Sequence, residues 1–315
     1  MWLYILIGLL AATALCILAG AVVSFKIVFY SPPRKPLKED EFEIPPGEAY
    51  EGFRKEMEDW VRMTRKMEHQ KFEIKSFDGL TLRGRYYECD PNGPVELLFH
   101  GYRGNAERDL SGGVERCFAL GRNALIIDQR SSGTSDGRVI TFGIREHRDC
   151  LAWVDFAVSH FGKDKKLILT GVSMGAATVL MAAGQKLPPN VVCVLADCGY
   201  TSPKEIIKKV IKDINFPVWF FYPLVKMAAF MFGFFRIERY SPIEAVKRSE
   251  VPIIFIHGDA DDFVPTAMSA TMYEACTSKH KSMVKIKGAG HGLAFPQDKE
   301  AYIQALRDFQ EKCGF

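Results

Sequence analysis

Short runs of apolar residues alternate with longer stretches of helical spacing from about residue 95 to the C-terminus. The runs are too short for helices and most are rich in β-branched residues, which is typical of strands buried on both faces of a sheet. Helical stretches lie between them near residues 105–120, 144–160 and 174–186. The pattern predicts a mainly parallel sheet with helices on both faces. The predicted strands are VELLFH (95–100), ALIID (124–128), KLILTG (166–171), VVCVLAD (191–197), PIIFIHG (252–258) and SMVKIKG (282–288).

Two elements are expected before the first of these strands. Apolar residues recur at helical spacing from Tyr50 to Met67, which predicts an amphipathic helix packed on the domain. The alternating residues around Asp78-Gly79 predict a β-hairpin.

Residues 201–250 interrupt the alternation and include the apolar stretch FPVWFFYPLVKMAAFMFGFF. A second membrane span, a pair of core helices and an inserted cap are the three interpretations. Pro217, Pro223 and Lys226 interrupt the stretch, and a predicted strand of the same sheet follows soon after it. We therefore expect a helical cap over 201–250, with membrane contact as a further role.

Residues 2–25 carry no charge and are long enough to cross a bilayer. A cleaved signal peptide is the alternative, but the apolar run is long and no basic residue precedes it. We expect a transmembrane anchor over 1–26, a Pro-rich linker over 27–48 and a folded domain over 49–315. Lys26, Arg34, Lys35 and Lys38 follow the anchor, which favours a single-pass protein with a cytoplasmic domain over one that faces outward.

Composition narrows the function classes. A formal net charge of +3, without a basic stripe interleaved with aromatic residues, disfavours a nucleic-acid partner. The eight cysteines are scattered and form no CxxC pair, which indicates buried thiols in a reducing compartment and no metal site. Neither a Walker lysine spacing nor a GxGxxG motif is present, so the Gly/Ser-rich loop in DQRSSGTSDG is expected to have a structural role rather than to bind phosphate.

Ser173 lies in the stretch LILTGVSMGAATVLMAA, between Gly171 and Gly175. A nucleophile must project from the carboxyl end of a strand, and a sharp strand-to-helix turn with small neighbours allows this. Ala176 and Ala177 let the following helix pack closely. The motif predicts a nucleophilic serine rather than a tight structural turn.

A serine nucleophile needs a base that is oriented by an acid. His291 lies between glycines in GAGHG after the last predicted strand, and it is the expected base. Three acids follow an earlier strand in HGDADDFVP, and Asp261 is preferred over its rivals Asp262 and Asp259. His100 is also at a strand end, where we expect it to hold the loop rather than to act in catalysis.

Two backbone amides are expected to bind the oxyanion. Met174 is the first residue of the helix after Ser173, and a helix N-terminus offers free N–H groups. In HGYRG, Gly101 lets the amide of Tyr102 turn toward the same point.

The order Ser173, Asp261, His291, together with the motifs HGYRG, DQRSSGTSDG, GVSMGA, HGDADDFVP and GAGHG, resembles the α/β-hydrolase superfamily over residues 70–315. With its N-terminal apolar helix, the chain is similar to bacterial membrane-anchored serine hydrolases of the group that contains the Bem46-like proteins. The resemblance implies an eight-stranded, mostly parallel sheet, a cap after the sixth strand and an acyl-enzyme route without a cofactor. DQRSSG replaces the usual Asp-x-Arg-Gly-x-Gly, and HGYRG lacks the glycine run of many lipases.

These observations predict a membrane-anchored serine hydrolase that cleaves carboxylic esters of small-molecule or lipid-like substrates. A peptidase or aminoacyl hydrolase and a thioesterase on the same triad are the alternatives within enzymes. A membrane-tethered binding protein without activity is the alternative from another class. The sequence sets neither the acyl length nor the oligomeric state.

Overall fold

The structure, a computed structural model, describes residues 1–33 and 38–315. Its centre is an eight-stranded sheet with the order β1-β2-β4-β3-β5-β6-β7-β8. β2 runs antiparallel to β1 and β4. The other six strands, β3 to β8, run parallel to one another. The strands are β1 (Gln70–Lys75), β2 (Thr81–Tyr87), β3 (Val95–Phe99), β4 (Asn123–Asp128), β5 (Leu167–Val172), β6 (Val191–Asp197), β7 (Ile253–Gly258) and β8 (Lys281–Ile286).

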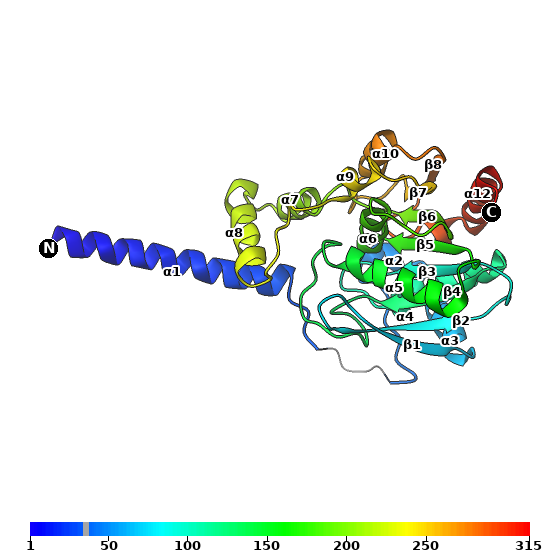
Figure 1. The fold of residues 1–315 in the computed structure, drawn as a ribbon. Helices are drawn as coiled ribbons and strands as arrows, with labels where there is room; N and C mark the ends of the chain where they lie inside the picture. Colours follow the sequence, from blue (N-terminus) through cyan, green and yellow to red (C-terminus); the bar gives the residue numbers. More distant parts are fainter. Residues whose placement is uncertain (34–37) are drawn as a thin grey trace.

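Helices cover both faces of this sheet, as the alternating pattern predicts (Figure 1). Leu97 and Phe99 pack with α5, α6 and α10, whereas Leu98 between them packs with α4 on the other face, because successive side chains of a strand alternate. The helices are α1 (Trp2–Val28), α2 (Glu48–Glu51), α3 (Arg54–Lys66), α4 (Ala106–Ala119), α5 (Glu146–Phe161), α6 (Met174–Ala183), α7 (Pro203–Asp213), α8 (Val218–Met231), α9 (Pro242–Val246), α10 (Thr266–Ala275), α11 (Ala294–Gln297) and α12 (Lys299–Cys313).

The predicted strands, the hairpin and the helices near 105–120, 144–160 and 174–186 are all confirmed. The amphipathic helix expected between Tyr50 and Met67 is α3, preceded by the short α2. Residues 201–250, where a cap is expected, form α7, α8 and α9 between β6 and β7, and their role as a cap stays a prediction. α8 has 14 residues with Pro223 inside it, and it packs on α1 and α7.

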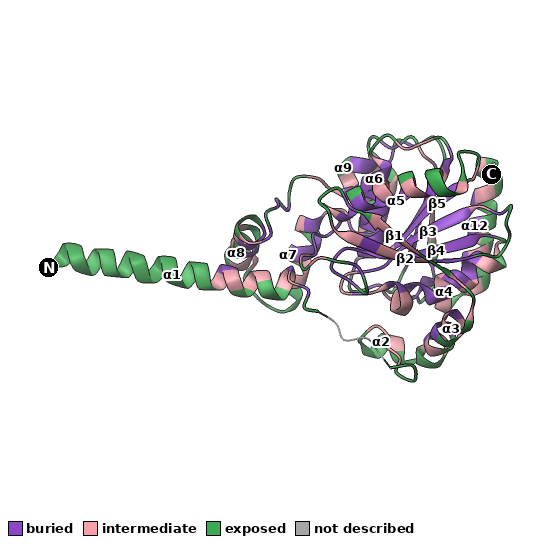
Figure 2. Cartoon of the chain, turned by 60° about the horizontal axis from the view of Figure 1, so that its bottom comes forward, coloured by how far each residue is buried: buried purple, intermediate pink, exposed green. Residues whose placement is uncertain are grey.

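α1 extends away from the rest of the molecule and is exposed along most of its length (Figure 2). Within the described residues it is the one helix long and apolar enough to cross a membrane. The division at residue 26 into anchor and linker stays a prediction, and residues 34–37 of that linker lie outside the described residues. The start of the linker is packed on the domain: Phe29 is fully buried and Tyr30 forms a β-bridge with Val139.

A separate apolar cluster joins the domain end of α1 to the cap and to the start of α6. Phe29 contacts Phe142 and Phe235 edge-on, with ring centroids 5.9 and 5.2 Å apart. Met174 belongs to the same cluster, as does Tyr222 of α8. The end of the apolar helix, the cap and the serine turn therefore share one core.

Candidate active site

Ser173 lies on a strained turn between β5 and α6. Its φ is 56°, a left-handed conformation that a side chain rarely adopts, and its N–H donates to the Asp197 carbonyl over 2.8 Å. A Cβ at Gly171 would overlap the backbone of Gly175, and one at Gly175 would overlap the carbonyl of Phe99. The two glycines are therefore a steric requirement of the turn, as the sequence predicts.

The structure brings together Ser173, His291 and Asp261 from three separate parts of the chain. His291 Nε2 lies 2.9 Å from Ser173 Oγ, and His291 Nδ1 lies 2.7 Å from Asp261 Oδ2. Burial raises the pKa of Asp261, but hydrogen bonds from His257 and His291 outweigh it and hold that pKa well below the usual range. Because the ionised carboxylate only accepts, Nδ1 carries the proton and Nε2 is left to accept from the serine hydroxyl.

The other two acids of HGDADDFVP lie elsewhere. Asp259 Oδ1 accepts the N–H of Gly288 over 2.6 Å, so this carboxylate holds the loop after β8. The backbone carbonyl of Asp262 accepts from Lys209 of α7. Of the three carboxylates, Asp261 is the one in contact with His291.

The loop after β3 lies against the serine turn. A Cβ at Gly101 would come to 3.6 Å from Cβ of Ser173, so the backbone at Tyr102 follows directly beside the nucleophile. The Gly101 N–H donates to Asp109 Oδ2 over 3.1 Å, and His100 is fully buried with its Nε2 accepting from the N–H of Gln129 over 3.0 Å. These contacts give His100 the loop-holding role expected from the sequence.

The side chains of this loop reach the end of α1. Tyr102 Oη donates to the Val28 carbonyl over 2.7 Å. Arg103, whose φ is 54°, donates from Nη2 to the carbonyls of Ile27 and Tyr30 over 2.7 and 3.1 Å. Carbonyls at a helix C-terminus lack intrahelical partners, so this loop supplies donors that the last turn of α1 needs.

Two further residues hold the site, and sequence reasoning missed both. His257, in β7, is fully buried; its Nε2 lies 3.1 Å from Asp261 Oδ2 and its Nδ1 lies 2.7 Å from Ser269 Oγ. Tyr50 Oη donates to the carbonyl of His291 over 2.8 Å. In the sequence, the only indication of the contact between His257 and Asp261 is their spacing of four residues. Nothing in the sequence indicates the contact between Tyr50 and His291.

Cys198, Asp261 and His291 lie close enough together to hold a cation, with their ligand atoms within 4.8 Å of one another. Both nitrogens of His291 are already hydrogen-bonded to Ser173 and Asp261. Burial raises the pKa of the Cys198 thiol well above its usual value, which keeps it protonated and a poor ligand. The arrangement therefore suits proton transfer better than metal binding.

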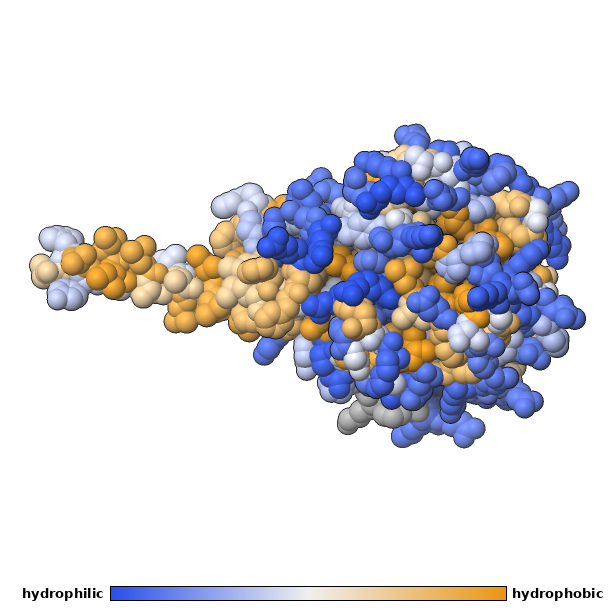
Figure 3. Space-filling view, in the orientation of Figure 1, coloured by the Kyte–Doolittle hydropathy of each residue, from blue (hydrophilic) through white to orange (hydrophobic). Residues whose placement is uncertain are grey.

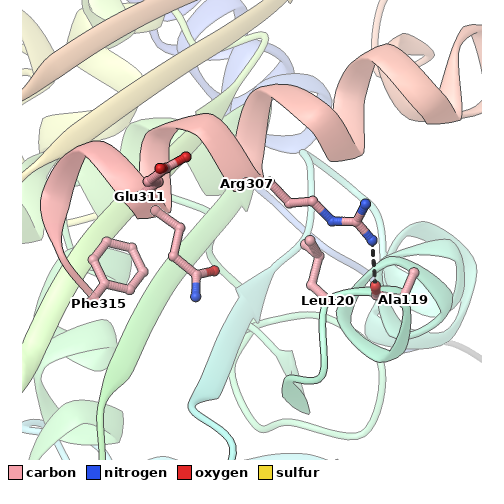
Figure 4. Close-up of a pocket in the computed structure, with 6 residues that line it drawn as sticks. Ala119, Leu120, Arg307, Glu311 and Phe315 are labelled. Carbon is pink, nitrogen blue, oxygen red and sulfur yellow. Dashed lines mark hydrogen bonds between the residues drawn. The ribbon is translucent and has the colours of Figure 1, made fainter.

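A surface pocket lies beside the amino ends of the strands, whereas Ser173 lies at their carboxyl ends. It is formed where α4 ends and α12 passes the start of β4, and Arg307 donates there to the Ala119 carbonyl (Figure 4). Ligands of open α/β sheets bind at the carboxyl ends of the strands, whereas this pocket lies beside their amino ends. It therefore has no part in the Ser173 site.

Comparison with known proteins identifies the class of fold. The chain matches the esterase Pf2001 of Pyrococcus furiosus with a TM-score of 0.64 and 20% identity, over 90% of this chain and 98% of that one. It is 23% identical to the uncharacterized protein YqkD of Bacillus subtilis, over 79% of this chain and 81% of YqkD. It is also 24% identical to the protein bem46 of Schizosaccharomyces pombe, over 77% of each chain. The protein has the α/β-hydrolase fold and resembles the Bem46-like proteins, as the sequence motifs predict.

The family itself follows from a model match over residues 141–314, which is more than half of the chain. The chain belongs to the prolyl oligopeptidase family. Family and fold together define it as a hydrolase.

Proposed function

We propose that the protein is a serine hydrolase that cleaves carboxylic esters through an acyl-enzyme intermediate. The observation that carries the proposal is the continuous hydrogen-bonded relay from Ser173 through His291 to Asp261. A strained serine, a base within hydrogen-bond reach of it and an acid that orients the base are the three parts that such chemistry requires.

In the proposed reaction, Ser173 Oγ attacks the ester carbonyl carbon while His291 Nε2 takes the hydroxyl proton. Asp261 stabilises the imidazolium that forms. The N–H groups of Tyr102 and Met174 donate to the oxyanion, where removal of one such donor typically costs about 10²–10³ in rate. His291 then gives its proton to the leaving alkoxide, and a water molecule repeats the sequence to release the acid.

A peptidase on the same residues is the second candidate, and the family match favours it. Both reactions pass through a tetrahedral intermediate, so the residues around Ser173 serve either one. The leaving nitrogen of an amide must be protonated as the bond breaks, whereas the leaving oxygen of an ester depends less on this proton transfer. The relative rates on amides and esters therefore distinguish a peptidase from an esterase, and the presence of the triad does not.

The experiment that tests the proposal uses the full chain in detergent micelles. p-Nitrophenyl esters of increasing acyl length, an acyl thioester and a prolyl p-nitroanilide are compared, with Ser173→Ala as the matched control. We expect ester turnover and fluorophosphonate labelling, both lost in Ser173→Ala. Full ester turnover by Ser173→Ala would refute the triad, whereas a preference for the anilide would replace the esterase by a peptidase.

We further propose that α1 is a single-pass anchor and that the hydrolase domain lies in the cytoplasm. Its apolar length and the basic residues that follow it support this orientation. Protease digestion of intact and permeabilised cells tests it, and degradation of the domain in intact cells would contradict it.

A further inference from the structure

The cap helix α8 exposes an unusual number of large apolar side chains. Tyr222 and Val225 face inward and are buried. The outward side of α8 and its flanks is formed by residues that are 42–80% exposed, and we call it the α8 face. The α8 face consists of Phe216, Trp219, Phe220, Phe230, Met231 and Phe234. A soluble monomer rarely leaves such a contiguous apolar surface in water, so this surface calls for an occupant.

The α8 face continues the apolar surface of α1. Phe25 of α1 and Phe232 at the end of α8 have ring centroids 5.8 Å apart, and a Cβ at Gly20 would lie 3.3 Å from Leu224. Figure 3 shows the apolar colouring running from α1 onto the part of the molecule where α8 packs. The medium that surrounds the exposed part of α1, whether water or lipid, is therefore expected to contact α8 as well.

The length of α1 fixes how close α8 comes to a bilayer. Residues 2–19 are exposed, and from Gly20 onward the helix packs against α8. At about 1.5 Å per residue the free part spans roughly 27 Å, against a hydrocarbon core of about 30 Å. A helix that spans the core must therefore bring its packed part, and α8 with it, down to the membrane surface.

Charge around the α8 face fits the same surface. Lys212, Lys226, Arg236 and Arg239 are exposed on α7, on α8 and in the loop after α8. Lys226 pairs with Glu238 over 2.8 Å, so part of this charge is already compensated. Aromatic side chains bordered by lysine and arginine are the composition of helices that lie in the interfacial region of anionic membranes.

We propose that α8 is a second membrane-contacting element, which lies in the interfacial region of the bilayer beside α1 and docks the cap on the lipid. The inference goes beyond the proposed hydrolysis and does not depend on it. Its consequence is that the cap is held against the membrane surface and not at the end of a flexible tether.

The test uses the fluorescence of Trp219, which is 79% exposed. The chain has four tryptophans; Trp60 and Trp153 are buried and Trp2 is exposed at the start of α1, so Trp2→Phe leaves Trp219 as the exposed one. This full-length variant is reconstituted in phosphatidylcholine–phosphatidylglycerol vesicles with either ordinary or brominated acyl chains. Insertion of about 5–10 Å brings the indole against the acyl chains, so we expect brominated lipid to quench roughly half of its emission.

The matched control carries Trp2→Phe, Trp219→Phe and Phe315→Trp. Position 315 ends the chain at the side of the molecule remote from α1 (Figure 1), so its indole should be quenched by aqueous iodide and not by brominated lipid. If the indole of Trp219 behaves like that control, the proposal is refuted. Protection of Trp219 from both quenchers, together with crosslinking between chains, would instead assign the α8 face to a second copy and would equally overturn it.

Discussion

The side chain of Tyr102 links the proposed oxyanion loop to the last turn of α1, and Tyr102→Phe removes the hydrogen bonds of its phenol group. The phenol donates to the Val28 carbonyl over 2.7 Å, and Arg103 Nε donates to the phenol oxygen over 2.9 Å. The ring itself stacks on Phe142 with centroids 5.0 Å apart, a contact that phenylalanine keeps. The backbone N–H that we propose as oxyanion donor is also retained.

The expected effect follows from the strength of the lost contact. A neutral hydrogen bond contributes about 0.5–1.5 kcal/mol, and a loss of about 1 kcal/mol from the transition state corresponds to a roughly fivefold lower rate. Removal of an oxyanion donor altogether costs about 10²–10³, which sets the upper limit. We therefore expect kcat to fall by about 2- to 10-fold in Tyr102→Phe, with KM close to that of the unaltered chain because the amide is displaced and no substrate contact is removed.

The assay is steady-state turnover of a p-nitrophenyl ester by the full chain, with thermal unfolding measured in parallel. Tyr240→Phe is the matched control, because Tyr240 Oη donates to the Met181 carbonyl over 3.1 Å at the far end of α6. It should lose a similar amount of stability and keep kcat. An unchanged kcat in Tyr102→Phe would refute the role of the Tyr102 phenol in positioning the oxyanion loop. If Ser173→Ala also kept activity, the fault would lie with the proposed triad instead.

Three other substitutions test separate parts of the structure. Asp261→Asn should lower kcat for ester turnover by about 10³–10⁴, because the base loses the carboxylate that orients it. Asp78 pairs with Arg130; burial raises the pKa of Asp78, but hydrogen bonds from Arg130 and Ser76 outweigh it and lower this pKa to about 2. Because the folded pKa is the lower one, the pair stabilises above about pH 4, and this stability is lost as the pH falls through about 2. After discounting for partial exposure, Asp78→Asn should cost about 1 kcal/mol at pH 7 and only a small part of that at pH 2 in urea unfolding. Gly175→Ala places a Cβ on the Phe99 carbonyl and should abolish soluble expression, whereas normal expression and activity would contradict the steric argument.

The sheet and the serine turn could be predicted because their signals are local. Strands buried on both faces are mainly apolar runs, as are β3 to β7, which are almost completely buried. A Cβ at Gly171 would overlap Gly175 in the same motif, and a Cβ at Gly175 would overlap Phe99 of the adjacent strand. Because these close contacts are local, the short motif is enough to predict the turn. His291 was identifiable because its loop directly follows the last strand.

The contacts of α1 could not be predicted, because they join residues that are far apart in the chain. Phe29 directly follows an apolar helix, and nothing in the hydrophobic pattern distinguishes it from the residues of that helix. Its burial against Phe142 and Phe235 depends on where the cap and the loop before α5 are placed in space. The hydrogen bond between Tyr102 and Val28 spans 74 positions and leaves no periodic signal. Long-range packing of this kind is set by the tertiary fold rather than by local propensity.

The sequence alone could not establish which of the three acids after β7 contacts His291. Spacing leaves Asp259, Asp261 and Asp262 within four residues of one another, and each is at the correct edge of the sheet. In the structure, Asp261 Oδ1 accepts the N–H groups of Phe263 and Val264 over 3.0 and 2.8 Å. The turn therefore fixes one carboxylate oxygen and leaves Oδ2 directed at the imidazole of His291. Which acid faces the base is thus determined by the backbone hydrogen bonds of the turn, and the side-chain types alone do not encode it.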